Sequence, residues 1–149
     1  MSEGLATRPP SIGEDIKQQK PFRTRSQEVY LGLVRAADDL KRRTSAVLEA
    51  GGVTLQQYNV LRILRGAGKE GLPTLTIGER MIERTPGVTR LIDRMERKGW
   101  VARKRCTEDR RRVWCKITEE GLALIEPLDE PVNALDDFLH GPLDETELS

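Results

Sequence analysis

Residues 84–103 read RTPGVTRLIDRMERKGWVAR, and this stretch decides the fold. Thr85 is a favoured N-cap residue, and Pro86 suits the first position of a helix because its missing N–H has no partner there. Gly99 is a typical helix terminator. The stretch therefore predicts a short helix that ends just before Gly99. Four apolar residues lie on one side of it at helical spacing, namely Val88, Leu91, Ile92 and Met95.

The opposite side of this predicted helix is basic. A step of 100° per residue places Arg90 and Arg97 there, with Arg94 at the flank. A guanidinium group can bond the O6 and N7 edge of guanine in the major groove, or a phosphate. The backbone N–H groups of Gly87 and Val88 at the start of the helix suit a phosphate. Alternatively, the arginines form an ordinary solvated face.

Two short β-rich runs, 100–106 and 112–117, follow Gly99 and are joined by a polar turn. This pattern predicts a hairpin. Its tip has the sequence Asp109-Arg110-Arg111-Arg112, and a guanidinium there would be attracted by the negative potential of a narrow minor groove. Asp109 also has a simpler interpretation as a turn former.

Helices are predicted on both sides of this region. Apolar residues recur every three or four positions over about 25–50, and Thr54 with Gln57 forms a capping box for the next helix. Thr74 is the expected N-cap of a short third helix that ends near Glu83. After the hairpin, Thr118 caps a helix over about 119–139. Pro127 and Pro131 predict an interruption within that last helix.

This order of elements is that of a winged helix-turn-helix, so the predicted fold is mainly α with a small β hairpin. Residues 1–21 are rich in Pro, Gly and polar groups and are expected to form a flexible arm. The remaining residues, 22–149, are expected to form one domain. Its winged lobe covers about 54–118, and its dimerisation helices cover about 25–50 and 119–149.

Composition excludes several classes of protein. The chain has 149 residues, with two cysteines and a single histidine, His140. These residues are too few for a zinc site of usual spacing or for a Ser-His-Asp enzyme, and we expect no cofactor. No apolar run is long enough to cross a membrane, and no export signal is seen, so we expect a cytoplasmic protein. The net charge is +1, but residues 84–116 carry +8 and residues 117–149 carry −10. Such segregation predicts a binding surface for an anionic partner, double-stranded DNA.

The quoted stretch, the Asp-x-Arg of the hairpin and Thr118-x-x-Gly121 resemble the multiple antibiotic resistance regulator (MarR) family. The resemblance implies a homodimeric repressor that binds pseudo-palindromic operators and is released by small phenolic or lipophilic ligands or by thiol oxidation. It also implies site residues by position. The groove-facing positions match Thr89, Arg90 and Arg94, the carboxylate that orients the wing matches Asp109, and the minor-groove arginine matches Arg111. We include Thr85, Gly87, Arg97, Arg110 and Arg112 in the predicted DNA-binding surface.

One departure from the family concerns the last helix, which in the family interleaves with the partner subunit. Here only its start is present, with a capping pattern at Asp144 and Glu147. We expect that the sequence omits the end of that helix, rather than that the dimer interface is reduced.

Three interpretations of other residues remain open. Tyr58 either lines an effector site or belongs to the core. Cys106 has basic neighbours that would lower its pKa, which allows a thiol-based redox regulator, whereas Cys115 is predicted to be buried. Finally, the winged helix could contact an acidic protein instead of DNA.

Overall fold

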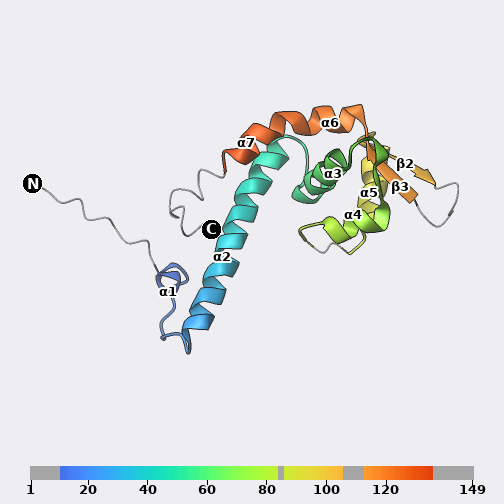
Figure 1. Cartoon of the computed structure of the whole chain (residues 1–149). Coiled ribbons are helices and arrows are strands. Elements are labelled where there is room, and N and C mark those ends of the chain that lie inside the picture. Colours follow the sequence, from blue (N-terminus) through green and yellow to red (C-terminus); the bar gives the residue numbers. More distant parts are fainter. Residues whose placement is uncertain (1–10, 84–85, 106–112, 136–149) are drawn as a thin grey trace, which may run out of the picture. The chain divides into compact units, whose positions relative to one another are not determined.

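The computed structural model describes residues 11–83, 86–105 and 113–135. Contacts divide the chain into two units, Met1–Arg42 and Arg43–Ser149. As predicted, the described part is mostly helical with a small sheet (Figure 1). Its elements are α1 (Ile12–Asp15), α2 (Arg25–Ala50), α3 (Leu55–Ala67), η1 (Gly68–Glu70), β1 (Leu72–Pro73), α4 (Thr74–Arg80), α5 (Val88–Arg97), β2 (Val101–Arg105), β3 (Val113–Ile117), α6 (Glu119–Ile125), η2 (Glu126–Leu128) and α7 (Asp129–Asn133).

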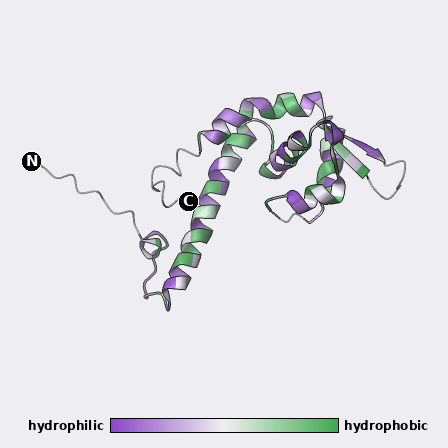
Figure 2. Ribbon diagram, viewed as in Figure 1, coloured by the Kyte–Doolittle hydropathy of each residue, from purple (hydrophilic) through white to green (hydrophobic). Residues whose placement is uncertain are grey.

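In the first unit, α1 begins with a capping box. The Ser11 N–H donates to the Glu14 carboxylate at 2.8 Å, and the Ser11 hydroxyl accepts from the Glu14 N–H. An ion pair of 3.0 Å joins Asp15 to Arg35 of α2. Apolar and polar residues alternate along α2 (Figure 2). Four of its large apolar side chains, 49–67% exposed, form an apolar strip at i and i+4 spacing: Val29, Tyr30, Leu33 and Val34.

The second unit encloses one hydrophobic core. Every helix from α3 to α6 contributes to it, as do the hairpin and the last turn of α2. The fully buried side chains are aliphatic or sulfur-containing: Leu48, Val60, Leu61, Leu64, Ile77, Ile92, Met95, Cys115 and Ile125. Their spacing within α3 and α5 is the helical spacing that the sequence predicted. The capping box at the start of α3 is also confirmed, with Thr54 and Gln57 bonded reciprocally at 3.0 and 3.3 Å.

The predicted hairpin is present and has a third strand that sequence analysis missed. Strands β2 and β3 pair antiparallel with Arg103 opposite Cys115, and β1 pairs with the other edge of β3, giving the order β1-β3-β2. At two residues, β1 is too short to show a hydrophobic alternation. Gly71 leads into it with φ +75°, and a Cβ there would lie 2.2 Å from the Cys115 carbonyl oxygen.

The predicted starts of two helices are wrong. Thr74 does not cap α4, because its hydroxyl donates to the Val113 carbonyl at 3.2 Å and contacts the Cys115 sulfur at 3.4 Å, so it ties α4 to β3 instead. Pro73 takes the N-cap position, and α4 ends at Arg80 rather than near Glu83. Helix α5 begins two residues later than Pro86, because Gly87 has a left-handed φ of 90° and forms the N-cap.

Beyond the hairpin, Thr118 connects three parts of the lobe. Its hydroxyl donates to the Gly99 carbonyl at 2.6 Å and accepts from the Gly121 N–H at 3.0 Å, so it caps α6 as predicted and holds the turn after α5. The interruption at Pro127 is confirmed as the 3₁₀ segment η2. Pro131 causes none, because it lies in the first turn of α7, where a missing N–H is tolerated.

Among the helices that the structure describes, none combines the length and apolar character needed to cross a lipid bilayer.

Candidate nucleic-acid interface

Helix α5 has one buried and one exposed face, as its sequence predicted. Leu91, Ile92 and Met95 are at most 2% exposed and anchor the helix in the core. The exposed residues on the other side include every predicted α5 contact: Thr89, Arg90, Arg94 and Arg97. Because three buried side chains fix the rotation of the helix about its axis, the three guanidinium groups are held outward.

Two of these arginines have side chains with no partner in the part of the chain that the structure describes. Within the described residues, neither the Arg90 nor the Arg94 guanidinium group forms a hydrogen bond or an ion pair; the Arg94 carbonyl accepts from the Lys98 N–H at the end of the helix. Both line a recess together with Gln56 of α3, Pro86, Gly87 and Leu91. Arg97 differs, because its Nε donates to the Asp93 carbonyl at 3.3 Å. The surface therefore presents uncompensated positive charge around the first two turns of α5.

The start of α5 adds backbone donors to this surface. Its N-cap, Gly87, is exposed and has no side chain to accept from the N–H groups of the first turn. Unsatisfied N–H groups and the positive end of the helix dipole favour an anion at this place. The turn before α5 is held by α3, since the Asn59 side chain accepts from the Ile82 N–H at 3.1 Å.

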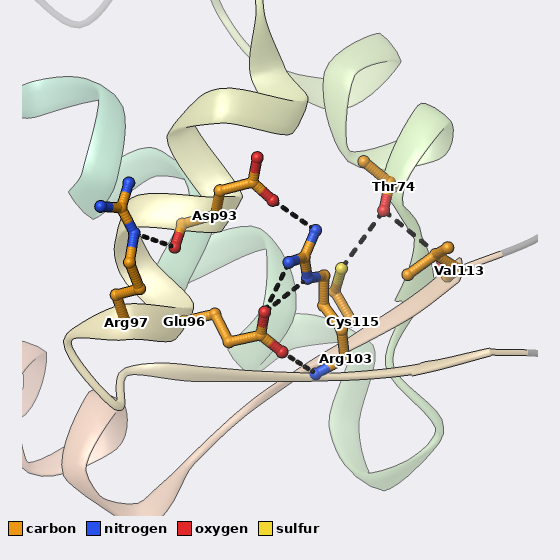
Figure 3. A network of polar contacts seen from close by, with 7 residues as sticks. All are labelled: Thr74, Asp93, Glu96, Arg97, Arg103, Val113 and Cys115. Carbon is orange, nitrogen blue, oxygen red and sulfur yellow. Dashed lines mark hydrogen bonds and ion pairs between the residues drawn. The ribbon is translucent and has the colours of Figure 1, made fainter.

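A third basic side chain of the region is used internally. The Arg103 guanidinium of β2 lies against Asp93 and Glu96 of α5, with nitrogen–oxygen distances of 2.5 Å to each carboxylate (Figure 3). The side-chain hydrogen bonds from Arg103 lower the pKa of Glu96, and those to Glu96 raise the pKa of Arg103. Both groups therefore stay charged together, and Arg103 is not part of the outward basic surface.

Several predicted residues lie outside the described part of the chain. These are Thr85, the hairpin tip from Asp109 through Arg110 and Arg111 to Arg112, and Cys106. The other cysteine, Cys115, is fully buried as predicted. Burial raises the pKa of the Cys115 thiol, which disfavours the reactive thiolate.

Tyr58 lies in the core, and the residue is only 4% exposed. Its hydroxyl donates to Asp129 at 3.4 Å, and Arg62 lies over its ring at 5.8 Å from the centroid. Burial is the largest cause of its raised pKa. An effector would reach Tyr58 only after this packing had opened.

Sequence analysis missed the residues that support the interface from behind. Gln56 and Asn59 are half-buried on α3, and their polar side chains carried no distinctive sequence pattern. The contact of Arg103 with two carboxylates did have a signal. Asp93 and Glu96 are acidic residues three apart in a segment that is otherwise strongly basic.

Comparisons with known proteins identify similar sequences and similar folds. The family model described as the MarR family matches residues 53–113. The HTH-type transcriptional regulator FarR of Neisseria gonorrhoeae is 30% identical over 113 residues, which cover 76% of each chain. Among solved structures, the complex of Staphylococcus aureus MepR with DNA is 26% identical with a TM-score of 0.72, over 85% of this chain and 89% of MepR. NadR in complex with 4-hydroxyphenylacetate is also 26% identical, with a TM-score of 0.69, over 87% of this chain and 90% of NadR.

Proposed function

This chain belongs to the MarR family of winged helix-turn-helix transcriptional regulators, and we propose that it regulates transcription by placing α5 in the major groove of duplex DNA. One observation carries the proposal: Arg90 and Arg94 are exposed and unpartnered among the described residues, on a helix whose other face is locked into the core. Unpaired arginines at fixed positions are what base or phosphate contacts require, because no internal salt bridge has to be broken first.

The roles of the α5 residues follow from their positions. Arg90 and Arg94, one turn apart, are placed to contact bases or phosphates in the groove, and Thr89 is exposed beside Arg90. Gly87, at the exposed start of the helix, would let a phosphate approach the first-turn N–H groups. Arg97, partly held by the Asp93 carbonyl, is better suited to a phosphate than to a base.

The hairpin tip and Thr85 complete the proposed surface. Arg111 would enter the minor groove and Asp109 would orient the wing, as the resemblance implies. Arg110 and Arg112, beside them at the hairpin tip, would add contacts to the minor groove or its flanking phosphates. Thr85 would contact the DNA sugar–phosphate backbone close to the start of α5.

A single α5 reads too few base pairs for specific binding, so we propose a homodimer on a pseudo-palindrome with half-sites about one helical turn apart. The apolar strip of α2, Val29, Tyr30, Leu33 and Val34, supports this part of the proposal. Exposed aliphatic and aromatic side chains at i and i+4 spacing are typical of a helix that packs on a partner. A second copy of the chain would remove them from water.

The regulator is proposed to act as a cytoplasmic repressor, not as an enzyme, and to respond to a small phenolic or lipophilic effector. The phenolic acid bound by NadR, which has a similar fold, supports this effector class. A thiol switch is the second candidate. The buried position of Cys115 leaves Cys106 as the cysteine on which it would depend.

The experiment is selection of bound sequences from a random DNA pool with the full chain at a stated salt concentration. Enrichment of a two-fold pseudo-palindrome supports the proposal. Enrichment of one unpaired half-site would contradict the dimeric mode, and the absence of any enriched sequence would contradict sequence-specific binding. A promoter reporter that carries the selected site then distinguishes repression from activation.

A further inference from the structure

Arg103 is central to a network that joins the hairpin to α5. Its Nη1 lies 2.5 Å from Asp93 Oδ1, while its Nη2 and Nε donate to Glu96 Oε2 at 2.5 and 2.8 Å (Figure 3). The Arg103 side chain is only 27% exposed. Three contacts to two carboxylates fix a planar guanidinium in position and orientation, which a single surface ion pair does not do.

Glu96 also binds the backbone of β2. Its second oxygen, Oε1, accepts from the Arg103 N–H at 3.2 Å. Because β2 is an edge strand in the order β1-β3-β2, the N–H groups on its outer side have no neighbouring strand to pair with. One carboxylate therefore satisfies both the side chain and the edge backbone of the same residue, which ties the strand itself to α5.

The α5 end of the network includes part of the proposed DNA surface. Asp93, which contacts Arg103 through its carboxylate, accepts from Arg97 Nε through its carbonyl. Asp93 thus holds Arg103 against α5 through its carboxylate, and holds Arg97 on the exposed face through its carbonyl. At the other end, β2 runs on to Arg105 and leads into the hairpin segment for which the sequence predicts minor-groove contacts.

We propose that Asp93, Glu96 and Arg103 form a positioning clamp, which contacts no DNA but fixes the direction of the hairpin relative to α5. The two elements would have to engage successive grooves of one duplex, so a fixed angle between them restricts binding to sites whose core and flanks are both suitable. The clamp is thus a specificity determinant for the proposed DNA-binding function, on which this inference rests.

Glu96→Gln tests the clamp, because the clamp and simple electrostatics predict opposite changes in the affinity for DNA. Loss of a negative charge near the proposed surface should by simple electrostatics strengthen binding to a polyanion. Loss of the clamp should instead weaken binding to DNA. We expect the variant to bind a selected duplex about tenfold or more weakly, the factor that corresponds to one lost charge-assisted hydrogen bond. We also expect it to lose discrimination between A·T-rich and G·C-rich flanks.

Two variants of β2 separate positioning from charge. Arg103→Met should reproduce both effects and leave the slope of log affinity against log salt concentration unchanged, since Arg103 is held by carboxylates and not by phosphates. Arg103→Lys, which keeps the charge and part of the bonding, should be intermediate. The matched control is Lys104→Met, since the Lys104 side chain is exposed and lies on the other face of β2. It should preserve flank discrimination.

The measurement is fluorescence anisotropy of the full chain on duplexes that differ only in their flanks, over a series of salt concentrations. Binding by Glu96→Gln that is as tight as, or tighter than, that of the parent would overturn the clamp. So would an Arg103→Met variant that lowers the salt slope by about one while keeping flank preference, because Arg103 would then be a phosphate ligand.

A measurement without DNA keeps failure of the clamp distinct from failure of the proposed function. Hydrogen exchange should be faster at the Arg103 amide in Glu96→Gln than in the parent, with α3 amides unchanged. Unchanged exchange at Arg103 would contradict the clamp even if the protein binds DNA. If the parent binds no selected duplex, the DNA-binding function fails, and exchange still reports on the contact itself.

Discussion

The Arg65 guanidinium forms two parallel hydrogen bonds to the Asp129 carboxylate, at 2.7 and 3.0 Å, and so joins the last turn of α3 to the first residue of α7. The Tyr58 hydroxyl donates to the same carboxylate at 3.4 Å. Asp129 lies within 119–149, the segment for which the sequence predicts dimerisation helices, so this contact connects α3 of the winged lobe to a segment that we propose to lead towards the partner subunit.

Asp129→Asn should lower the free energy of unfolding. The amide keeps the shape of the carboxylate but removes the charge that Arg65 and Tyr58 both use. Since the Arg65 and Asp129 side chains are 32% and 36% exposed, we expect a loss of about 1 kcal/mol, smaller than for a fully buried pair. Urea unfolding followed by circular dichroism measures it. The control is Glu119→Gln, an exposed acid at the start of α6, which should change stability less.

The same contact should make stability depend on acid pH. Hydrogen bonds from Arg65 are the main cause that lowers the pKa of Asp129 below its ordinary value of 3.8. Its contribution to stability is therefore complete above that value and is lost as the pH falls through the lower pKa of the folded state. The stability difference between the parent and Asp129→Asn should be constant near neutral pH and shrink below about pH 4. A difference that grows on acidification would contradict this assignment.

Gly121→Ala should destabilise the lobe strongly. An added Cβ would lie 2.2 Å from the Trp100 carbonyl oxygen, which itself accepts from the Thr118 N–H at 3.1 Å and has little freedom to move. The expected loss is about 1–3 kcal/mol. Gly66→Ala in α3 is the matched control, because nothing lies within 4 Å of its added Cβ. It should stabilise the protein by roughly 0.5–1 kcal/mol. Equal melting temperatures for the two variants would refute this close packing.

The thiol of Cys115 should react slowly in the folded protein. It is fully buried, and burial raises its pKa, so little thiolate is exposed to a reagent. Cys106→Ser leaves Cys115 as the single cysteine of the chain. In that variant we expect labelling by a thiol reagent to be slow in buffer and fast in denaturant. Fast labelling in buffer, with loss of DNA binding, would make Cys115 a candidate redox switch.

Arg90→Ala should weaken DNA binding by about 1–3 kcal/mol and relax sequence preference at one position of each half-site. Arg90 is exposed and has no partner among the described residues, so its removal disturbs no internal contact. Anisotropy titrations of the parent and the variant on the same duplex measure the effect. Lys69→Ala, which removes an exposed cation from η1, is the charge control. An equal loss in both variants would show that only net charge matters.

The elements that the sequence predicted well are those with a local cause. The apolar spacing of Leu91, Ile92 and Met95 was enough to place both faces of α5, and Thr118 was enough to place the start of α6. The predicted starts of α4 and α5 were wrong because distant or unusual geometry decided them. The Thr74 hydroxyl bonds a strand about 40 residues away, and Gly87 adopts a left-handed conformation.

The interface was predictable only on its outer side. Exposed arginines opposite an apolar face have a period, so the exposure of Arg90 and Arg94 could be predicted from the sequence. Contacts that depend on tertiary pairing have none. The positions of Gln56, of Asp129 beside Arg65, and of Arg103 between two carboxylates required the packed lobe.

Dimethyl sulfate interference on a selected operator tests the proposed binding mode most directly, since the reagent methylates guanine N7 in the major groove and adenine N3 in the minor groove. We expect interference at guanines in two clusters about 10 base pairs apart, one for α5 of each subunit, and interference at adenines in the flanks. Arg90→Ala should remove the interference at one guanine position in each cluster. Interference at adenine N3 alone, or none at guanine N7, would show that α5 does not read the major groove.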